Sequence, residues 1–292
     1  MKRILITGAN SYIGTSFKAY LSKNYPSEYT VDIIDMINET WREKNFAEYD
    51  SVFHVAGIVH QKETKENAEL YYRVNRDLAI ETAVKAKNDG VKHFILMSSM
   101  SVYGMNTGVI NKDTIPNPRS NYGKSKLQAE EEILKLKDDN FLITIVRPPM
   151  VYGLGCRGNF NSVVKLTVKL PVFPKIKNQR SMIHIDNLSE FLRFAVDLEL
   201  QGIYTPQNRE YICTCDMAKW ISEARGKKLY MSSILGFIIK LLIPFINIAQ
   251  KGFGNLIYHR ELENFDFTYC VTRSEESVKN SIIKQEENVC ER

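Results

Sequence analysis

Three side chains in the middle of the sequence have the types and the spacing needed to move a proton. Ser99 offers a hydroxyl, and about twenty residues later Tyr122 and Lys126 offer a phenol and an ammonium. Positions i and i+4 share one face of a helix, so this spacing brings the phenol and the ammonium together. A nearby ammonium favours the phenolate over the neutral phenol. We therefore predict that Tyr122 is a general acid or base, with Ser99 hydrogen-bonding the same substrate hydroxyl.

The Tyr-x-x-x-Lys spacing also occurs by chance on many helices, so the prediction depends on the elements around it. Residues 2–7 form an apolar, β-branched run, followed at once by Gly8–Ala9–Asn10–Ser11–Tyr12–Ile13–Gly14 and a helical pattern. A strand, a tight turn and a helix start in this order bind the pyrophosphate of a dinucleotide through backbone N–H groups. Ser11 replaces the middle glycine of that fingerprint, but it is small and its hydroxyl can donate to a phosphate oxygen.

A second apolar strand is expected over residues 30–34, and it ends in Asp35. A carboxylate at this position accepts hydrogen bonds from the ribose hydroxyls and repels a 2′-phosphate. NAD is therefore favoured over NADP as the cofactor. The alternative for Asp35 is an ordinary turn residue at the end of a strand.

The rest of the first half alternates between strand and helix patterns. We expect strands over residues 51–56, 92–97 and 141–146, and helices over 64–88 and 122–137. This alternation predicts an α/β fold, a doubly wound parallel sheet of Rossmann type with ligands at the carboxyl ends of its strands. The residues at or just after those strand ends are Gly8, Asp35, Ala56, Gly57, Ser99 and Pro148.

Length and composition fit one such domain with a smaller lobe attached. The chain has 292 residues, 44% of them hydrophobic and 25% charged, which is ordinary for a globular protein with a sizeable core. We predict that residues 1–150 form the dinucleotide-binding domain, with 181–201 returning to it. Residues 151–180 and 202–292 are expected to form a C-terminal substrate-binding lobe.

Charge and cysteine content limit the classes of ligand and the cellular location that we expect. A net charge of +5 can help to steer an anionic substrate, but no basic run with interleaved aromatics predicts nucleic-acid binding. Five cysteines without framework spacing predict reduced thiols, and the chain starts directly with a strand, so a cytoplasmic location is expected. Cys213 and Cys215 would lie on one face of a strand over 211–215. We expect core positions for them, and no metal site.

Seven segments of the sequence match one known pattern when they are taken together. They are Gly8 to Gly14, His54–Val55–Ala56–Gly57, Asn75, Ser98–Ser99–Met100–Ser101–Val102–Tyr103–Gly104, Tyr122–Gly123–Lys124–Ser125–Lys126, Arg147–Pro148–Pro149–Met150–Val151–Tyr152–Gly153, and Arg180–Ser181–Met182–Ile183–His184–Ile185–Asp186. Over roughly the first two thirds of the chain this set resembles the extended short-chain dehydrogenase/reductases, the NAD-dependent epimerase/dehydratase family, and in particular its nucleotide-sugar enzymes of the UDP-glucose 4-epimerase type.

The resemblance implies roles for the matching positions. Ser99, Tyr122 and Lys126 would form the catalytic triad. The NAD would be surrounded by Gly8, Ser11, Tyr12, Ile13, Asp35, Val55, Ala56, Gly57, Asn75, Met97, Ser98, Tyr122, Lys126 and Pro148. Ser101, Asn159 and Arg180 would bind the substrate, with Asn159 and Arg180 at its diphosphate, because a guanidinium presents a bidentate fork to phosphate oxygens. The alternative for Arg180 is a solvated surface charge.

Departures from the family pattern narrow the reaction. Family dehydratases carry an acidic pair directly after the triad hydroxyl, where this chain has Met100 and Ser101. Well-studied 4-epimerases keep an asparagine shortly after the Arg147 position, where this chain has Pro148–Pro149–Met150, as in a subgroup found among capsule and O-antigen sugar genes. The resemblance implies a 4-epimerase of a UDP-hexose or UDP-N-acetylhexosamine, working through a transient 4-keto sugar. The alternative is an NAD(P)H-dependent 4-ketoreductase of a UDP-4-keto-6-deoxy sugar in surface polysaccharide synthesis.

A third reading is a non-catalytic protein that senses a dinucleotide, although such proteins typically lose the tyrosine that Tyr122 provides.

The helices carrying Tyr122 and Asn75 resemble those of the family's four-helix dimer contact, so a homodimer is expected.

Two C-terminal segments have no counterpart in the motifs. Residues 234–248 are apolar but too short to span a bilayer, and they contain Lys240 and Pro244. We expect a helix packed in the substrate lobe, and the alternative is a helix lying on a membrane surface. Residues 273–292 are expected to be a surface helix or a partly disordered tail.

Overall fold

Six parallel strands form the central sheet of the protein. The structure is a computed structural model, and it describes residues 1–59, 63–156, 158–263 and 265–290, except for the side chains of Asn159 and 285–290. Their spatial order is β2, β1, β3, β4, β6, β10. The strands are β1 (Lys2–Thr7), β2 (Tyr29–Ile34), β3 (Ser51–His54), β4 (His93–Met97), β6 (Leu142–Val146) and β10 (Gly202–Tyr204). Every residue of β3, β4 and β6 is buried, as continuous apolar strands are when helices cover both faces of a sheet. The predicted doubly wound sheet is confirmed.

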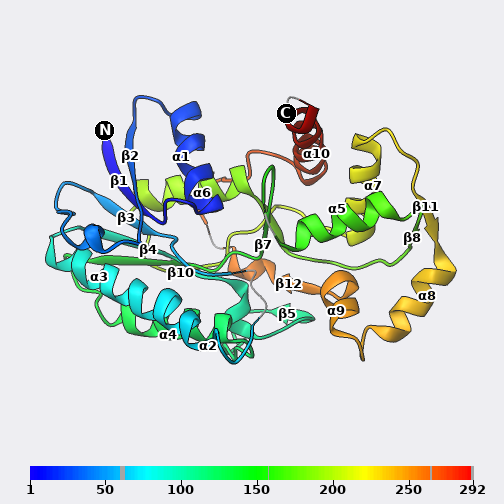
Figure 1. The fold of residues 1–292 in the computed structure, drawn as a ribbon, viewed down its shortest axis with the longest axis horizontal. Helices are drawn as coiled ribbons and strands as arrows, with labels where there is room; N and C mark the ends of the chain where they lie inside the picture. Colours follow the sequence, from blue (N-terminus) through cyan, green and yellow to red (C-terminus); the bar gives the residue numbers. More distant parts are fainter. Residues whose placement is uncertain (60–62, 157, 264, 291–292) are drawn as a thin grey trace.

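Two groups of helices cover the two faces of this sheet (Figure 1). On one face α1 (Tyr12–Asn24) and α6 (Ile185–Asp197) pack together, with Phe17 and Phe191 fully buried. On the other lie α2 (Ala68–Tyr72), α3 (Leu78–Asn88) and α4 (Asn121–Leu134), whose small residues Ala83 and Ala129 bring the helices close to the strands. The expected return of 181–201 toward the sheet corresponds to α6.

The strand order reverses beside β1. After β2 the chain makes only a short 3-10 helix, Glu39–Arg42, before β3 pairs with the opposite edge of β1. Trp41 and Phe46 are buried against the sheet and anchor this short connection. In open α/β sheets, ligands bind at the carboxyl ends of the strands where the order reverses. Gly8 and Ala56 both lie at this point.

The helix expected over 64–88 is interrupted. A π-helical turn, Arg73–Asp77, separates α2 from α3, and Asn75 lies inside it. Such turns are rare and are often found at functional sites. The interruption lets a buried polar side chain leave the regular helix face.

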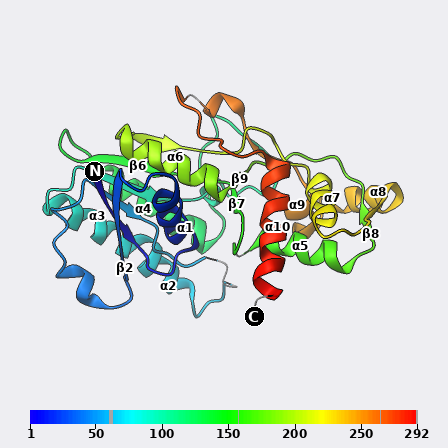
Figure 2. The same ribbon diagram turned by 90° about the horizontal axis from the view of Figure 1, so that it is seen from above.

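The remaining elements build the smaller lobe (Figure 2). Two two-stranded pairs join it to the first part, β7 (Met150–Tyr152) with β9 (Met182–His184) and β5 (Gly108–Ile110) with β12 (Leu256–Tyr258), and a third, β8 (Val172–Pro174) with β11 (Tyr230–Ser232), lies within it. Its helices are α5 (Asn159–Lys169), α7 (Thr214–Ala224), α8 (Ser233–Leu242), α9 (Asn247–Phe253) and α10 (Ser274–Cys290). We propose the division into 1–150 with 181–201, and 151–180 with 202–292, amended so that β10 belongs to the first part because it extends the central sheet.

Two expectations for this lobe are wrong in part. The strand expected over 211–215 is an extended approach to a helix: Ile212 makes an isolated bridge to Arg180, and α7 begins at Thr214. The segment 234–248 is not one packed helix, because α8 ends at Leu242 and most of the side chains up to Ile248 are exposed.

The other two lobe segments are ordered by packing. Residues Ser274–Cys290 form α10, whose Val278 and Ile282 are buried beside Ile221 of α7. Cys215 is buried against Phe173, and Cys213 is half-buried. Within the described ranges, no helix has the length and apolar character to cross a membrane.

Candidate active site

The three predicted catalytic side chains lie together at the carboxyl end of β4. Ser99 lies two residues beyond the end of that strand, and its side chain interacts with that of Tyr122 in the first turn of α4. One turn later, the Lys126 ammonium donates to the carbonyl oxygen of Met97 over 2.9 Å. The chain therefore brings a hydroxyl, a phenol and an ammonium to one place, as their spacing predicts.

The start of α4 is positioned by local sequence. Ser120 caps the helix by accepting a hydrogen bond from the Gly123 amide at 3.0 Å. A Cβ atom on Gly123 would lie 2.7 Å from the Ser101 carbonyl oxygen. Glycine is needed here because the helix meets the backbone of the turn that carries Ser99 and Ser101.

Burial sets the protonation of the two titratable groups. It raises the pKa of Tyr122, while the hydrogen bond from Ser99 opposes that rise. It lowers the pKa of Lys126 to about 8, against the opposing field of Glu130. In the protein alone the pKa of Tyr122 is therefore raised rather than lowered, with desolvation as the largest cause. The effect expected of Lys126 on the phenol stays a prediction.

A buried network of charged and polar side chains holds α4 against the end of the sheet. Glu130, one turn beyond Lys126, forms a bidentate ion pair with Arg147 and accepts a hydrogen bond from the Ser98 hydroxyl. Arg147 also donates to the Tyr103 hydroxyl over 2.9 Å. Ser98, predicted to touch the cofactor, thus directs its side chain into this network. Sequence reasoning missed Glu130, although its i+4 spacing from Lys126 was a usable signal.

A second missed residue is Glu63. Its carboxylate accepts hydrogen bonds from the backbone amides of Asn121 at 2.9 Å and Tyr122 at 3.1 Å. It thereby pairs with the N-terminal end of α4, where a negative charge is favourable. No local signal identifies Glu63, because its partners are more than fifty residues away.

The glycine turn after β1 has the shape needed to hold a pyrophosphate. Gly8 has a φ of 115°, and a Cβ atom there would lie 3.0 Å from the backbone of Ala56. A Cβ atom added to Gly14 would lie 2.9 Å from the Ile6 side chain and 3.0 Å from the Val55 side chain. Ser11 caps α1 by accepting from the Gly14 amide at 3.2 Å, which leaves its hydroxyl proton available. With no acidic residue in its first turn, the N-terminal end of α1 suits an anion.

The other predicted cofactor residues surround this turn. Asp35 follows β2 and is half-buried, with one carboxylate oxygen accepting from the Ile37 amide at 2.9 Å. Ile13 and Val55 pack into the core on the α1 side of the sheet. The Tyr12 hydroxyl is buried beside Gly153 and has no hydrogen-bond partner among the described residues. These side chains shape the floor of the turn, and the Asp35 carboxylate keeps an oxygen for a ribose.

Asn75 fixes the loop after β3 rather than pointing freely into the site. Its side-chain oxygen accepts from the Ile58 amide at 2.9 Å, and its side-chain nitrogen donates to the Ile58 carbonyl at 3.1 Å. A Cβ on Gly57 would lie 2.7 Å from Asn75 Oδ1 and 3.5 Å from Lys126 Nζ. The π-helical turn therefore holds the Gly57 backbone against the lysine. On the other side, the carbonyl of buried Pro148 accepts from the Met100 amide at 3.0 Å.

The predicted substrate residues lie on the lobe side. Ser101 is exposed, and its Oγ is 3.1 Å from that of Ser99. Arg180 donates to the carbonyl oxygens of Gly254 at 2.9 Å and Gln250 at 3.4 Å. Burial lowers the pKa of Arg180 to about 10, and among the described residues no carboxylate pairs with it. Asn159 is the first residue of α5, and its side chain lies outside the described part.

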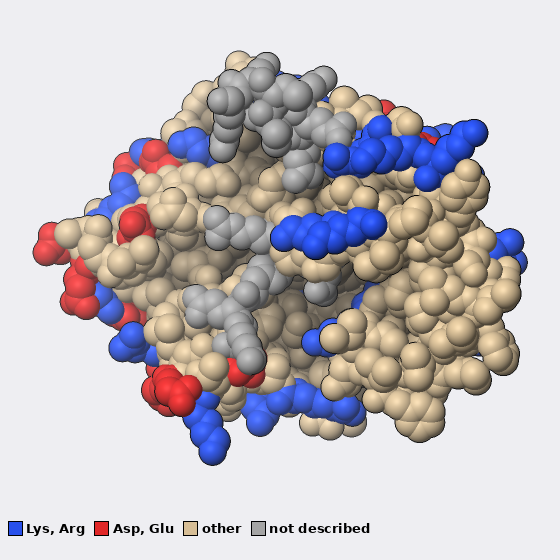
Figure 3. All heavy atoms as spheres, turned by 45° about the vertical axis from the view of Figure 1, so that its right-hand side comes forward, with Lys and Arg blue, Asp and Glu red and all other residues tan. Residues whose placement is uncertain are grey.

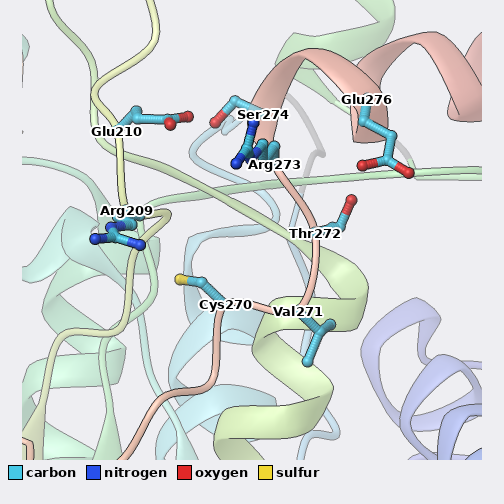
Figure 4. Close-up of a pocket in the computed structure, with 8 residues that line it drawn as sticks. All are labelled: Arg209, Glu210, Cys270, Val271, Thr272, Arg273, Ser274 and Glu276. Atoms are coloured by element: carbon cyan, nitrogen blue, oxygen red, sulfur yellow. The ribbon is translucent and has the colours of Figure 1, made fainter.

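A cavity of about 590 Å³ lies elsewhere, beside the start of α10 (Figure 4). Its lining includes Arg209, Glu210, Arg273 and Glu276, and none of the triad residues. Charges of both signs are exposed there, so this cavity has no part in the chemistry of Tyr122.

Comparison with known proteins agrees with this geometry. Residues 4–204 match the model of the NAD-dependent epimerase/dehydratase family. The chain belongs to that family. It is therefore an NAD-dependent enzyme of the extended short-chain dehydrogenase/reductase type, and the Gly8–Ser11 turn, the α1 N-terminus and Asp35 fit the cofactor.

Individual relatives share this family membership. The chain is 31% identical over 267 residues to a UDP-glucose 4-epimerase of Vibrio cholerae, covering 82% of this chain and 81% of that protein. It is 27% identical over 207 residues to the N-acetyl-alpha-D-glucosaminyl-diphospho-ditrans,octacis-undecaprenol 4-epimerase of Escherichia coli O157:H7, covering 65% and 62%. Among solved structures, UDP-glucuronic acid 4-epimerase of Bacillus cereus has the same fold, with a TM-score of 0.70 at 19% identity over 97% of this chain and 99% of that chain.

Proposed function

We propose that the protein is a nucleotide-sugar 4-epimerase acting on a UDP-hexose or UDP-N-acetylhexosamine. The observation that carries the proposal is the meeting of Ser99, Tyr122 and Lys126 at the end of β4, on the same sheet edge as the Gly8 turn. The 4-epimerase of Vibrio cholerae, similar over most of both chains, supports it.

The mechanism assigns one task to each side chain. Tyr122 removes the proton of the sugar 4-hydroxyl, and Ser99 hydrogen-bonds the same oxygen. Bound NAD⁺ supplies a hydride acceptor and a positive charge that favours the phenolate. Lys126, held by the Met97 carbonyl, keeps an ammonium beside the phenol. With NAD bound, C4 would lose a hydride as its hydroxyl loses the proton, which would give a 4-keto sugar. After that sugar turned in the site, C4 would regain the hydride on its other face and Tyr122 would return the proton to the oxygen.

The substrate diphosphate is assigned to Arg180, with Asn159 and Ser101 as further substrate contacts. A guanidinium that is largely desolvated and bonded only to carbonyl oxygens among the described residues favours an anionic ligand. Ser101 lies beside Ser99 and can reach the sugar.

A 4-ketoreductase is the second candidate, because it needs the same triad. The GDP-6-deoxy-D-mannose reductase of Pseudomonas aeruginosa is 27% identical over 173 residues, about half of each chain. The Pro148–Pro149–Met150 segment is compatible with both candidates, since the subgroup that it resembles contains presumed epimerases and 4-ketoreductases. A dinucleotide sensor is disfavoured by the intact pair of Tyr122 and Lys126.

The experiment that separates these candidates incubates the purified chain with UDP-sugars and follows the products by NMR. Formation of the C4 epimer without added cofactor supports the epimerase. Turnover only when a UDP-4-keto-6-deoxy sugar and reduced cofactor are supplied selects the reductase. No turnover in either arm, together with NAD binding, selects the sensor.

The partners and the location complete the proposal. We assign a homodimer through α2, α3 and α4, which lie side by side and are linked by hydrogen bonds from Arg76 to Gln128 and from Tyr72 to Asn121. A cytoplasmic location, where NAD and nucleotide sugars are available, belongs to the same proposal. Light scattering of the purified chain tests the dimer.

A further inference from the structure

The far end of the C-terminal lobe presents large apolar side chains to solvent. Ile234 is 77% exposed, Phe237 64%, Leu241 57%, Phe245 84% and Ile248 83%. They lie on α8, at the start of α9 and on the turn between them, at the end of the molecule opposite β1 and β2 (Figures 1 and 2). We call these five residues the apolar tip. A contiguous exposed apolar surface of this kind marks an interaction site.

The tip is not simply the outer side of an ordinary surface helix. The inner side of α8 is already defined, because Ile239 packs against the Phe173 cluster and Gly236 meets the backbone of Lys175. A surface helix usually carries polar residues on the side away from its core. On α8 the exposed positions include Ser233 and Lys240, but the other five are large apolar residues, Ile234, Phe237, Ile238, Leu241 and Leu242, so most of the outer side is apolar too.

The chain segments that contain the tip and its packing partner β8 carry basic but no acidic residues. Residues 140–185 and 224–260 contain no aspartate or glutamate. Eight lysines in these segments are exposed and have no ion pair with any described residue; they are Lys165, Lys169, Lys175, Lys177, Lys227, Lys228, Lys240 and Lys251. On the face seen in Figure 3, acidic side chains gather on the left, and the part that comes forward on the right is mostly tan and blue.

We propose that the apolar tip docks on an anionic lipid bilayer, with Phe237, Leu241 and Phe245 entering the boundary between headgroups and acyl chains. Apolar side chains with flanking lysines bind in this way, by burying apolar area and by attraction to anionic lipids. The ten residues of α8 are too few to span a bilayer, so the helix lies along the surface. A second copy is a poorer occupant, because a two-fold contact would bring the same lysines together without acidic partners.

The tip is physically connected to the candidate substrate site. Arg180 donates to the carbonyls of Gln250 and Gly254, at the C-terminal end of α9. Docking would therefore hold this arginine close to the bilayer surface. The docking itself requires no particular reaction at Tyr122, so it stands or fails independently of the proposed function.

Vesicle sedimentation of the full chain tests the proposal. We expect binding to vesicles of phosphatidylcholine with 30% phosphatidylglycerol to be at least about ten-fold tighter than to pure phosphatidylcholine, and to weaken as salt is raised. The double variant Phe237→Ser/Phe245→Ser and the double variant Lys240→Glu/Lys251→Glu should each lose about ten-fold in binding. Ile115→Ser, which alters an equally exposed side chain outside the tip, is the matched control and should bind like the unaltered chain.

Thermal unfolding checks that each variant is folded before it is compared. Absence of sedimentation, equal binding to neutral and anionic vesicles, or equal losses in the Ile115→Ser control would overturn the proposal. So would light scattering that shows a concentration-dependent dimer lost in the Phe237→Ser/Phe245→Ser variant while vesicle binding is absent.

Discussion

The region around Tyr122 and the apolar tip differ in how far their side chains find partners within the chain. Near Tyr122, charged groups find partners inside the fold, as Lys126 does at the Met97 carbonyl and Glu130 does at Arg147. At the tip, Phe237 and Phe245 keep most of their surface exposed. The first region is organised by contacts within one chain, and the second leaves large apolar side chains exposed, which we propose are covered by a bilayer. Substitutions in the two regions should therefore be detected by different measurements.

The largest effect is expected at the phenol. Tyr122→Phe removes the group that moves the proton, and turnover should fall by roughly 10²–10⁴-fold, the usual contribution of general acid–base catalysis. NAD affinity, measured by fluorescence titration, should change less than about three-fold because the glycine turn is intact. A variant that lost NAD binding in parallel would instead indicate a structural role for the phenol.

The next effect concerns stability. Glu130→Gln leaves Arg147 buried without its carboxylate, and breaking a buried ion pair on one side costs about 3–5 kcal/mol of unfolding free energy. Glu81→Gln breaks the partly exposed pair with Arg42 and should cost no more than about 1 kcal/mol. Urea unfolding of both variants measures the difference, and equal losses would contradict the supporting role of the network.

A smaller effect is expected at the glycine turn. Gly8→Ala places a Cβ 3.0 Å from the Ala56 backbone at a positive φ, so it should weaken NAD binding and lower stability by about 1–2 kcal/mol or more. Gly90→Ala is the matched control, since Gly90 also has a positive φ but no atom within 4 Å of the added Cβ. It should lose similar backbone stability and keep its NAD affinity. Calorimetry with and without NAD distinguishes the two.

The lowered pKa of Lys126 predicts opposite pH trends for activity and stability. The folded chain releases this proton near pH 8, whereas the unfolded chain keeps it to about pH 10.4. If turnover needs the ammonium, it should fall as the pH rises through about 8. In Lys126→Arg this decline should occur at a higher pH, because the guanidinium stays charged. The burial penalty on the ammonium is fully present below pH 8 and is relieved between pH 8 and 10. In that window Lys126→Met should remove a stabilising trend; an unchanged pH dependence of unfolding would contradict the assignment.

The smallest effect is expected at the tip. Phe237→Ala should change the free energy of unfolding by less than about 0.5 kcal/mol, because the side chain is exposed. Phe17→Ala, in the core between α1 and the sheet, should cost about 3–5 kcal/mol. A large loss in Phe237→Ala would mean that the tip packs within the chain and would remove the contrast between the two regions.

Most of the fold and of the candidate site could be predicted from short stretches of the sequence. Apolar runs that end in Gly8, Asp35 or Ser99 identify strand ends, and the parallel topology brings such ends to one edge. The spacing of Tyr122 and Lys126 fixes their common helix face. These features depend on residues close in sequence, so the sequence alone was enough to predict them.

What the sequence did not reveal depends on distant contacts. Glu63 reaches the start of α4 from another loop, and the π-helical turn around Asn75 is stabilised by the loop after β3. The 211–215 pattern reads as a strand because Ile212 is buried in a bridge to Arg180, while α7 begins directly after it. The exposure of 234–248 was missed because apolar sequence normally indicates burial.

The most direct test of the central claim follows the hydrogen on C4 in heavy water. We predict that the chain converts a UDP-hexose into its C4 epimer in D₂O with the original hydrogen retained on C4, and that Tyr122→Phe yields no epimer under the same conditions. Deuterium at C4 of the product, or epimer formation by Tyr122→Phe, would contradict the account.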